Sequence, residues 1–316
     1  MVEVAVLGSG AMGSLYGGTL AASGCGVVFI DVWKDHVDAI NQRGLVIEEP
    51  GGAKTVRGAR AVSKASDAGT ADLVIVFVKA TATEEAMREA LPLVGEKTSV
   101  LTLQNGLGNV EKLCKVVPAS RVIAGTTGHG ATLLGPGKIR HAGVGDTVIG
   151  ELDGSRSPRV EVVATLLKKA GMTVKISENV LGLIWTKLIV NVGINALTAV
   201  TGLKNGRLTD FPEMEVLMKA AIDEACTVAK AKGVALEIAE PFEHTRNVAK
   251  KTGANRSSML QDILAKRQTE IAVINGAIVE EGKKLGISTP INALLTSLVL
   301  VRQQTYEEAY EGKANA

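Results

Sequence analysis

The feature that most constrains this fold is a glycine-rich turn close to the start of the chain. An apolar segment, VEVAVL, precedes the turn, and a helical run of small residues follows it. The turn has the pattern G-x-G-x-x-G, formed by Gly8, Gly10, Ala11, Met12 and Gly13. The first glycine permits a tight turn, the second lets backbone approach a pyrophosphate, and the third lets helix and strand pack closely. Free N–H groups of the first helical turn then favour phosphate, so the pattern predicts a dinucleotide site.

The first half of the chain continues this alternation of strands and helices. GVVFID at 26–31 predicts a second strand, and DLVIVFV at 72–78 is a continuous apolar run, typical of a parallel strand buried on both faces. The stretch at 45–62 predicts two hairpin-type strands around a Pro-Gly-Gly turn. Residues 1–178 are therefore predicted to form an α/β domain with a Rossmann-type doubly wound sheet.

The second half has a different pattern, in which helix follows helix with Gly and Pro as turn signals. A chain of 316 residues is long enough for two domains. Residues 179–316 are therefore predicted to form an all-helical substrate and catalytic domain. Its expected helices span 180–201, 213–232, 240–251, 258–285 and 290–311.

Composition excludes several classes of function. The 35 basic and 33 acidic residues give a net charge of +2, and aromatic residues make up only 3%, so nucleic-acid binding is not expected. No uncharged apolar run reaches the roughly 18 residues of a membrane span, and the strand-like start EVAVLG gives no expectation of a signal peptide. The cysteines are far apart and the histidines lack ligand spacing, so neither a metal site nor a disulfide framework is expected. These features indicate a cytoplasmic protein.

Three residues at predicted strand ends are candidates for cofactor binding. Asp31 ends the second strand, where a carboxylate accepts hydrogen bonds from the adenosine ribose and repels a 2′-phosphate; its alternative role is an N-cap. Lys79 follows a buried strand and would contact a phosphate or ribose, or else be a solvated loop lysine. Asn105 would contact the nicotinamide side, or serve as a turn residue before Gly106.

An apolar helix, WTKLIVNVGINAL at 185–197, carries an unexpected polar stripe. Lys187, Asn191 and Asn195 recur every four residues and so share one helix face. A buried ammonium group requires hydrogen-bond partners, which the two amides would supply. The stripe therefore predicts the lining of a polar cleft. The alternative is a lysine at the helix rim with its amides facing solvent.

A second polar interruption lies in the predicted helix 258–285. Ser258 and Gln261 resemble a capping box at its start, and Glu270 then places a carboxylate in an apolar stripe. One interpretation is an ordinary ion pair with Lys266. The other sets Glu270 opposite Lys187 across the cleft.

Several motifs taken together resemble those of the ketopantoate reductase (2-dehydropantoate 2-reductase) family. They occur in the family's order along nearly the whole chain. The motifs are GSGAMG at 8–13, VKA at 78–80, LQNGLGN at 103–109, GTTGHGA at 125–131, KLIVNVGINALTAVTGLKNG at 187–206 and NRSSMLQDILAKRQTEI at 255–271. The last two are specific to this family and to its close 2-hydroxyacid dehydrogenase relatives.

The resemblance implies a reaction and a set of residue roles. The reaction is hydride transfer from a nicotinamide to the C2 ketone of 2-dehydropantoate, giving (R)-pantoate in pantothenate and coenzyme A synthesis. Lys187 matches the family's general acid, and Glu270 matches the carboxylate that positions the substrate and the lysine. Lys79 and Asn105 match cofactor contacts, Asn105 lying between nicotinamide and substrate. The positions that match substrate-binding residues are Asn191, Asn195, Asn205, Asn255 and Ser258.

One departure from the family pattern concerns the choice of cofactor. Members that use NADPH carry a basic residue near the end of the second strand, where this chain has Asp31 and Val32. Asp31 thus favours NADH, whereas the habit of the family favours NADPH. An NADH-linked (R)-2-hydroxyacid dehydrogenase acting on another branched or aromatic 2-oxo acid is the alternative, and a non-catalytic dinucleotide sensor is a third hypothesis. The long C-terminal helices are compatible with a homodimer, and a two-domain monomer fits equally well.

Overall fold

The chain divides into two compact units. The computed structural model describes residues 2–307. Unit 1 comprises Met1–Gln104 and Gly108–Leu181, and unit 2 comprises Asn105–Leu107 and Gly182–Ala316. The change of unit after Leu181 lies three residues beyond the predicted boundary at 178. The sequence did not predict that a three-residue segment of the first half, Asn105–Leu107, belongs with the helical unit.

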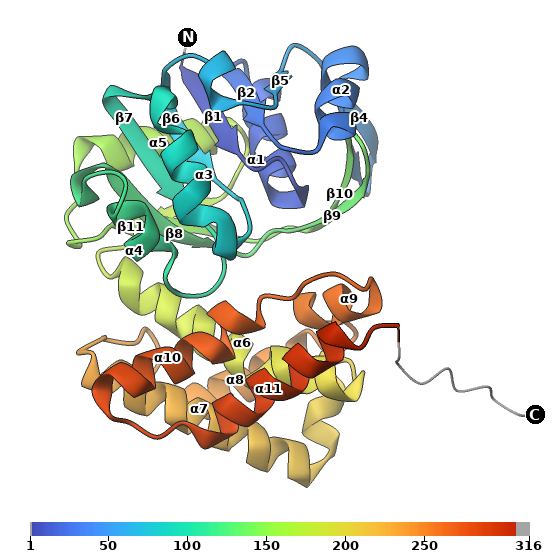
Figure 1. Cartoon of the computed structure of the whole chain (residues 1–316), viewed down its shortest axis with the longest axis vertical. Coiled ribbons are helices and arrows are strands. Elements are labelled where there is room, and N and C mark those ends of the chain that lie inside the picture. The colour runs from blue at the N-terminus through green and yellow to red at the C-terminus, as the bar shows by residue number, and fades with distance from the viewer. Residues whose placement is uncertain (1, 308–316) are drawn as a thin grey trace, which may run out of the picture. The chain divides into compact units, whose positions relative to one another are not determined.

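Unit 1 is built on an eight-stranded sheet of order β12-β11-β8-β7-β6-β1-β2-β5 (Figure 1). Its strands are β1 (Glu3–Leu7), β2 (Gly26–Ile30), β5 (Arg60–Val62), β6 (Ala71–Val76), β7 (Val94–Thr102), β8 (Val122–Thr127), β11 (Thr147–Glu151) and β12 (Val174–Ile176). The run from β8 to β5 is parallel, as the apolar run at 72–78 predicted, and β11 is antiparallel to β8. The carboxyl ends of β1, β2, β6 and β7 therefore meet at one edge, where ligands bind in such sheets.

A second, four-stranded sheet has the order β4-β3-β10-β9. Its strands are β3 (Leu45–Glu49), β4 (Gly52–Val56), β9 (Gly130–Gly135) and β10 (Lys138–Gly143). β3 and β4 form the predicted antiparallel hairpin, whereas β10 pairs in parallel with β3. The last residues of the stretch 45–62 form β5, which pairs with β2 in the eight-stranded sheet.

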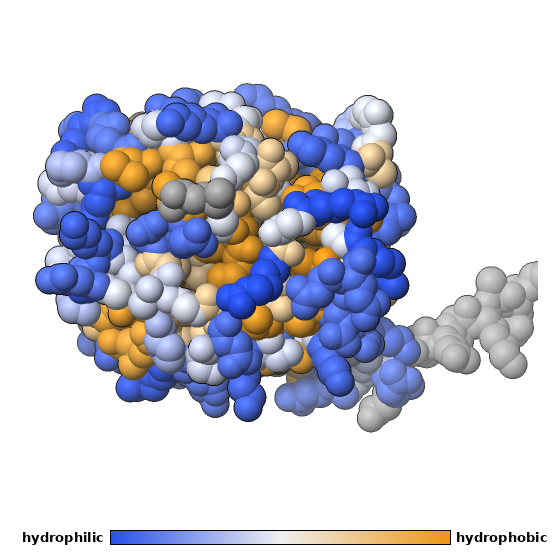
Figure 2. All heavy atoms as spheres, turned by 90° about the horizontal axis from the view of Figure 1, so that it is seen from above, coloured by the Kyte–Doolittle hydropathy of each residue, from blue (hydrophilic) through white to orange (hydrophobic). Residues whose placement is uncertain are grey.

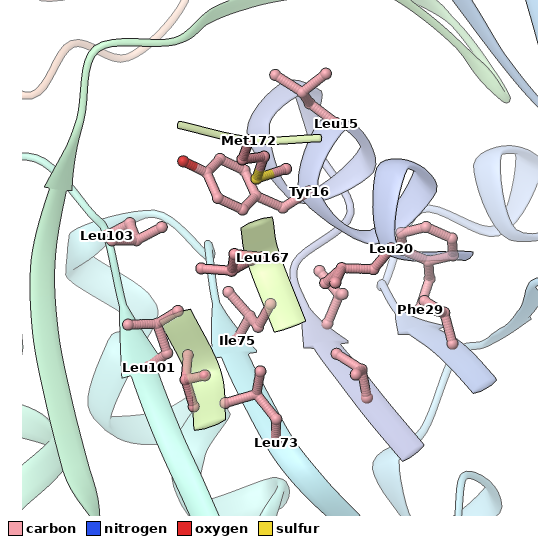
Figure 3. Packing of buried hydrophobic residues seen from close by; sticks show 14 of the residues in the cluster. Leu15, Tyr16, Leu20, Phe29, Leu73, Ile75, Leu101, Leu103, Leu167 and Met172 are labelled. Carbon is pink, nitrogen blue, oxygen red and sulfur yellow. The ribbon is translucent and has the colours of Figure 1, made fainter. Parts of the chain in front are cut away.

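Helix α1 (Ala11–Ala22) lies between the two sheets, since it contacts β1 and β2 as well as β3, β9 and β10. Two glycines make this close packing possible. A Cβ at Gly17 would lie 2.3 Å from the ring of Phe29, and one at Gly18 would lie 2.7 Å from Leu45. The apolar side chains of α1 enter the main core together with residues of β6, β7 and the segment that precedes β12 (Figure 3). The small-residue composition of α1 thus reflects packing on both of its sides.

The remaining helices of unit 1 flank the sheets. They are α2 (Lys34–Arg43), α3 (Thr83–Glu89), α4 (Asn109–Cys114) and α5 (Pro158–Lys169), with 3-10 turns η1 (Ala65–Asp67), η2 (Ala80–Ala82), η3 (Leu91–Leu93) and η4 (Ala119–Arg121). Helix α5 begins where a sequence rule would place it, because Ser157 accepts a hydrogen bond from the Val160 N–H and proline follows it. On the face shown in Figure 2, hydrophobic groups are interspersed with hydrophilic residues.

Unit 2 is helical within the described residues. Its elements are α6 (Val180–Thr201), η5 (Asn205–Asp210), α7 (Pro212–Ala231), α8 (Pro241–Lys251), α9 (Ser258–Leu264), η6 (Ile271–Val273), α10 (Asn275–Leu285) and α11 (Pro290–Gln304). Helix α6 is long and apolar enough to cross a membrane, with a hydropathy of 1.7, but 67% of that window is buried inside the protein. Its apolar faces belong to the core of this unit. An α/β unit followed by a helical one confirms the predicted fold class.

Two predicted helices end earlier than expected. The helix predicted at 258–285 is wrong, because α9 stops at Leu264 and α10 begins only at Asn275. The chain turns at Lys266, whose φ is 51°, and the Arg267 N–H returns to the carbonyl of Asp262. The hydroxyl of Tyr306 donates to the carbonyl of Arg267, so a residue from far along the sequence stabilises this break. The helix predicted at 290–311 ends at Gln304, and residues 308–311 of that prediction lie outside the described residues.

Candidate active site

The glycine-rich turn has the geometry of a pyrophosphate cradle. It joins β1 to α1, and no side chain caps the helix at Gly10, so first-turn N–H groups face outward. A Cβ at Gly10 would meet no atom within 4 Å, which leaves room for a ligand. At Gly13, by contrast, a Cβ would lie 1.9 Å from the carbonyl oxygen of Gly8, so only glycine allows the helix to pack there. The turn therefore fits a dinucleotide phosphate.

Asp31 is anchored to this turn rather than to a helix. One carboxylate oxygen accepts the Ser9 N–H at 2.7 Å and the Ser9 hydroxyl at 2.9 Å, and the other accepts the Trp33 N–H at 2.9 Å. Helix α2 begins at Lys34, and the residue before it, Trp33, provides no side-chain cap. The N-cap alternative for Asp31 is therefore wrong. The carboxylate is held in place at the end of β2, next to the phosphate turn.

A buried polar chain behind the turn was not predicted. The Ser14 hydroxyl donates to the carbonyl of Ser9, and Nε2 of His36 lies 3.3 Å from the Ser14 oxygen. The Gly137 N–H donates to Nδ1 of His36, so that nitrogen is an acceptor and the neutral ring carries its proton on Nε2. Burial lowers the pKa of His36, and the charge of Asp31 partly offsets this. A helical histidine gives no sequence signal for such a role.

Lys79 and the loop around it lie at the same sheet edge. Lys79 follows β6 and is exposed, as expected for a residue at the carboxyl end of a strand. The amide of Gln104 donates to the carbonyl of Val78 and to the hydroxyl of Thr83, and Lys112 donates to the carbonyl of Ala80. Gln104 and Lys112 were not singled out from the sequence, and they fix the backbone on both sides of Lys79.

The polar stripe of unit 2 lies on α6. Lys187, Asn191 and Asn195 occupy successive turns of this helix, and Asn195 is buried. Lys187 keeps some surface exposure, but dense packing around its ammonium group lowers its pKa from the usual 10.5 to about 8. The negative charge of Glu270 acts in the opposite direction and raises the pKa. Lys187 is therefore mostly protonated near neutral pH, but it releases its proton more readily than an ordinary lysine.

Glu270 reaches this lysine from a turn, because it lies in the break between α9 and α10. Its Oε2 accepts a hydrogen bond of 3.2 Å from the side-chain amide of Asn105. The proposed ion pair between Lys266 and Glu270 is not present, since Lys266 pairs with Glu307 instead. The charge of Glu270 does act on Lys187, although the helical face that was expected to bring the two residues together does not exist.

The segment Asn105–Leu107 is fitted closely against the turn that carries Glu270. The Leu107 N–H donates to the carbonyl of Val273 at 2.9 Å. Gly106 has a φ of 81°, and a Cβ there would lie 2.4 Å from that same carbonyl oxygen. A glycine is therefore required at this position by both conformation and space. The Asn-Gly pair of the sequence is a turn, as the alternative proposed, and it also presents the Asn105 amide to Glu270.

The remaining predicted substrate residues fall into two groups. Asn205 is buried, its N–H donates to the carbonyl of Asn255, and its Nδ2 donates to the hydroxyl of Thr252. Within residues 2–307, Oδ1 of Asn205 is a buried acceptor without a hydrogen-bond partner. Asn255 and Ser258 are exposed, and Ser257, not Ser258, caps α9 by accepting the Leu260 N–H. The capping box predicted at Ser258 and Gln261 is therefore wrong, since the N-cap lies one residue earlier and Leu260 stands three residues after it.

Comparison with known proteins identifies the family. The model described as "Ketopantoate reductase PanE/ApbA" matches residues 4–154, and its C-terminal counterpart matches residues 179–303. The chain belongs to the ketopantoate reductase family. It is 38% identical over 303 residues to the 2-dehydropantoate 2-reductase of Halobacterium salinarum, covering 96% of this chain and 99% of that one. It is 36% identical to the 2-dehydropantoate 2-reductase of Pyrococcus horikoshii, covering 96% and 98%.

Solved structures extend the comparison to the cofactor. A ternary structure of D-mandelate dehydrogenase with NADH and anilino(oxo)acetate superposes with a TM-score of 0.90 at 30% identity, covering 97% of this chain and all of that one. A ketopantoate reductase from Ralstonia eutropha gives a TM-score of 0.89 at 34% identity, covering 97% and 100%. Members of this family are oxidoreductases that use nicotinamide cofactors. In the described part of the chain no cluster of three His, Cys, Asp or Glu residues fits a metal ion.

Proposed function

We propose that this protein reduces 2-dehydropantoate to (R)-pantoate, a step of pantothenate and coenzyme A synthesis. The observation that carries the proposal is Lys187, whose pKa of about 8 suits a proton donor, next to Glu270 held by Asn105. The names of the most similar curated relatives support the choice of substrate. Three free cysteines agree with action in the reducing cytoplasm.

Different side chains are assigned to different parts of this reaction. The Gly8–Gly13 turn, Asp31 and Lys79 would hold a reduced nicotinamide dinucleotide, which would supply a hydride to the C2 carbonyl carbon. Lys187 stabilises the negative charge that develops on the carbonyl oxygen and donates a proton from Nζ, so that C=O becomes CH–OH and the lysine becomes a neutral amine. Glu270 keeps this lysine protonated, since its charge raises the lysine pKa. Asn105 is assigned to the cofactor, between nicotinamide and substrate. The side chains assigned to substrate hydroxyl and carboxylate groups are Asn191, Asn195, Asn205, Asn255 and Ser258.

We further propose that NADH is preferred over NADPH. The Asp31 carboxylate is oriented by Ser9 and Trp33 and would repel a 2′-phosphate at the adenosine ribose. The structural neighbour with a TM-score of 0.90 was solved with NADH.

A second candidate function is that of an NADH-linked (R)-2-hydroxyacid dehydrogenase. The likeness to D-mandelate dehydrogenase favours it, since mandelate carries an aromatic ring at the position of the branched chain of pantoate. A sensor without catalysis is less consistent with the site, because such a protein needs no proton donor beside a carboxylate.

The deciding experiment follows oxidation of reduced nicotinamide by the purified protein with ketopantoate, using NADH and NADPH in parallel, and then with benzoylformate. Turnover with ketopantoate supports the proposal, whereas turnover with benzoylformate alone supports the second candidate. Lys187→Met should lower kcat about 10²–10⁴-fold while NADH binding survives. Lys219→Met is the matched control, because Lys219 is an exposed lysine of α7 paired with Asp223. Full activity of the Lys187 variant would refute the assigned role.

A further inference from the structure

A buried asparagine connects the turn that carries Glu270 to the helix that carries Lys187. Asn275 is fully buried and is the first residue of α10. Its Nδ2 donates to the carbonyl of Val192 on α6 at 3.3 Å and to Oδ1 of Asn292 at 3.0 Å. Both N–H bonds of the carboxamide are thus used. Since the Val192 carbonyl can only accept, the orientation of this amide is fixed.

The second acceptor, Asn292, is itself anchored. It is fully buried, and its Nδ2 donates to the carbonyl of Ala221 and to Oε2 of Glu224, both on α7. The carboxylate of Glu224 also accepts the N–H groups of Ile291 and Asn292 at the start of α11. Asn275 therefore joins α6 to a part of the unit that is already held by three hydrogen bonds to one carboxylate.

Glu270 is placed by the same short segment. The N–H groups of Val273 and Ile274 both return to the carbonyl of Glu270, so residues 270–274 form one compact turn that leads directly into Asn275. The carbonyl of Val273, in the same turn, accepts a hydrogen bond from the Leu107 N–H. The amide of Asn275 is thus one polar link from the end of this turn to α6.

We propose that Asn275 is a positioning residue of the reaction, which sets the Glu270 carboxylate at the distance from α6 that keeps Lys187 protonated. This inference rests on the proposed role of Lys187 as proton donor. Leucine has the same branched shape as asparagine and is bulkier, but it donates no hydrogen bond, so Asn275→Leu leaves the Val192 and Asn292 acceptors without this partner. The turn then loses this hydrogen bond to α6, and we expect Glu270 to raise the pKa of Lys187 less.

The test compares Asn275→Leu with Asn292→Leu in the full chain. Asn275→Leu should lower kcat about tenfold or more, because small displacements of catalytic groups have large effects, while KM for NADH changes less than about twofold. In a plot of rate against pH, the fall in rate at basic pH should move to lower pH in this variant. Asn292→Leu disturbs the same network on the α7 side and retains the Asn275–Val192 bond, so its pH limb should stay in place even where its thermal stability falls. Asn275→Ser serves as a milder variant where the leucine variant does not fold.

A second readout does not require activity. The Lys187 pKa is followed by NMR in protein with isotope-labelled lysine, with the resonance assigned by its loss in Lys187→Arg. A lower Lys187 pKa in Asn275→Leu, but not in Asn292→Leu, supports the inference even where the substrate is a different 2-oxo acid. An unchanged pKa, or equal shifts in both variants, would overturn it. If the wild-type protein does not turn over ketopantoate but the Lys187 pKa still falls only in Asn275→Leu, the proposed function is contradicted and this inference is not.

Discussion

The pH dependence of catalysis tests most directly whether Lys187 is the proton donor. An ordinary lysine with a pKa of 10.5 would stay protonated throughout the useful range, whereas Lys187 has a pKa of about 8. The difference corresponds to about 3 kcal/mol in favour of the neutral amine, and burial is its main cause. Roughly nine-tenths of the molecules are protonated one pH unit below this pKa, and about one-tenth are one unit above it.

The assay is kcat/KM for the 2-oxo acid measured from mildly acidic to strongly basic pH with saturating NADH, because this quantity reports groups of the enzyme–NADH complex before the oxo acid binds. A proton donor must be charged to act. The rate should therefore be constant below the Lys187 pKa and fall about tenfold per pH unit above it. The limb should lie near pH 8, and in Glu270→Gln it should move to lower pH, since the negative charge that raises the lysine pKa has been removed.

Two results would refute this reasoning. A wild-type limb close to that of an ordinary lysine would show that the ammonium group is not desolvated in the working enzyme. A limb that moves to higher pH in Glu270→Gln would show that the glutamate does not stabilise the lysine charge. A lower rate in Glu270→Gln without a movement of the limb would assign Glu270 to substrate positioning alone.

Two further substitutions test the cofactor site and the Asn105 turn. Asp31→Arg should change the NADPH to NADH ratio of kcat/KM by about tenfold or more, since repulsion is replaced by a charge-assisted bond to the 2′-phosphate; an unchanged ratio would mean that Asp31 only fixes Ser9. Gly106→Ala should lower both kcat and stability, the latter by about 1–3 kcal/mol, because its Cβ would lie 2.4 Å from the Val273 carbonyl oxygen. Gly108→Ala is its control, with a φ of 87° but no atom within 4 Å; equal losses of stability in the two variants would exclude the contact as the cause.

The sequence predicted structure most accurately where the residues of one short segment are enough to specify it. The G-x-G-x-x-G turn, the buried run at 72–78 and the amphipathic spacing of α6 each specify their own structure, because periodicity and glycine conformation are local properties. Helix α6 begins and ends where the sequence predicted, at Val180 and Thr201. The reversal between α9 and α10 contains no Gly or Pro to mark it. It depends instead on Tyr306, which is 39 residues away from Arg267.

The candidate site shows the same difference between residues marked by a local pattern and residues whose role depends on distant partners. Lys187 and its two asparagines were recognised because a charge on an apolar helix is unusual and a four-residue spacing is visible in one dimension. Glu270 was noticed as a carboxylate that interrupts an apolar stripe, and the resemblance to a family supplied its role, but its predicted helical placement was wrong. Gln104, His36 and Asn275 were missed, since a single polar residue in an ordinary segment has no pattern until its partners are known.

The sequence by itself determined the α/β and helical halves, the phosphate turn, and the acidic residue at the end of β2. These features follow from the order of residues over one or two turns of chain. Only the tertiary structure decided that Asn105–Leu107 joins the helical unit, and that Glu270 acts from a turn. The pKa of Lys187 likewise arises from burial and from a carboxylate more than eighty residues away along the chain. Desolvation and charge depend on distance in space, which the order of residues does not contain.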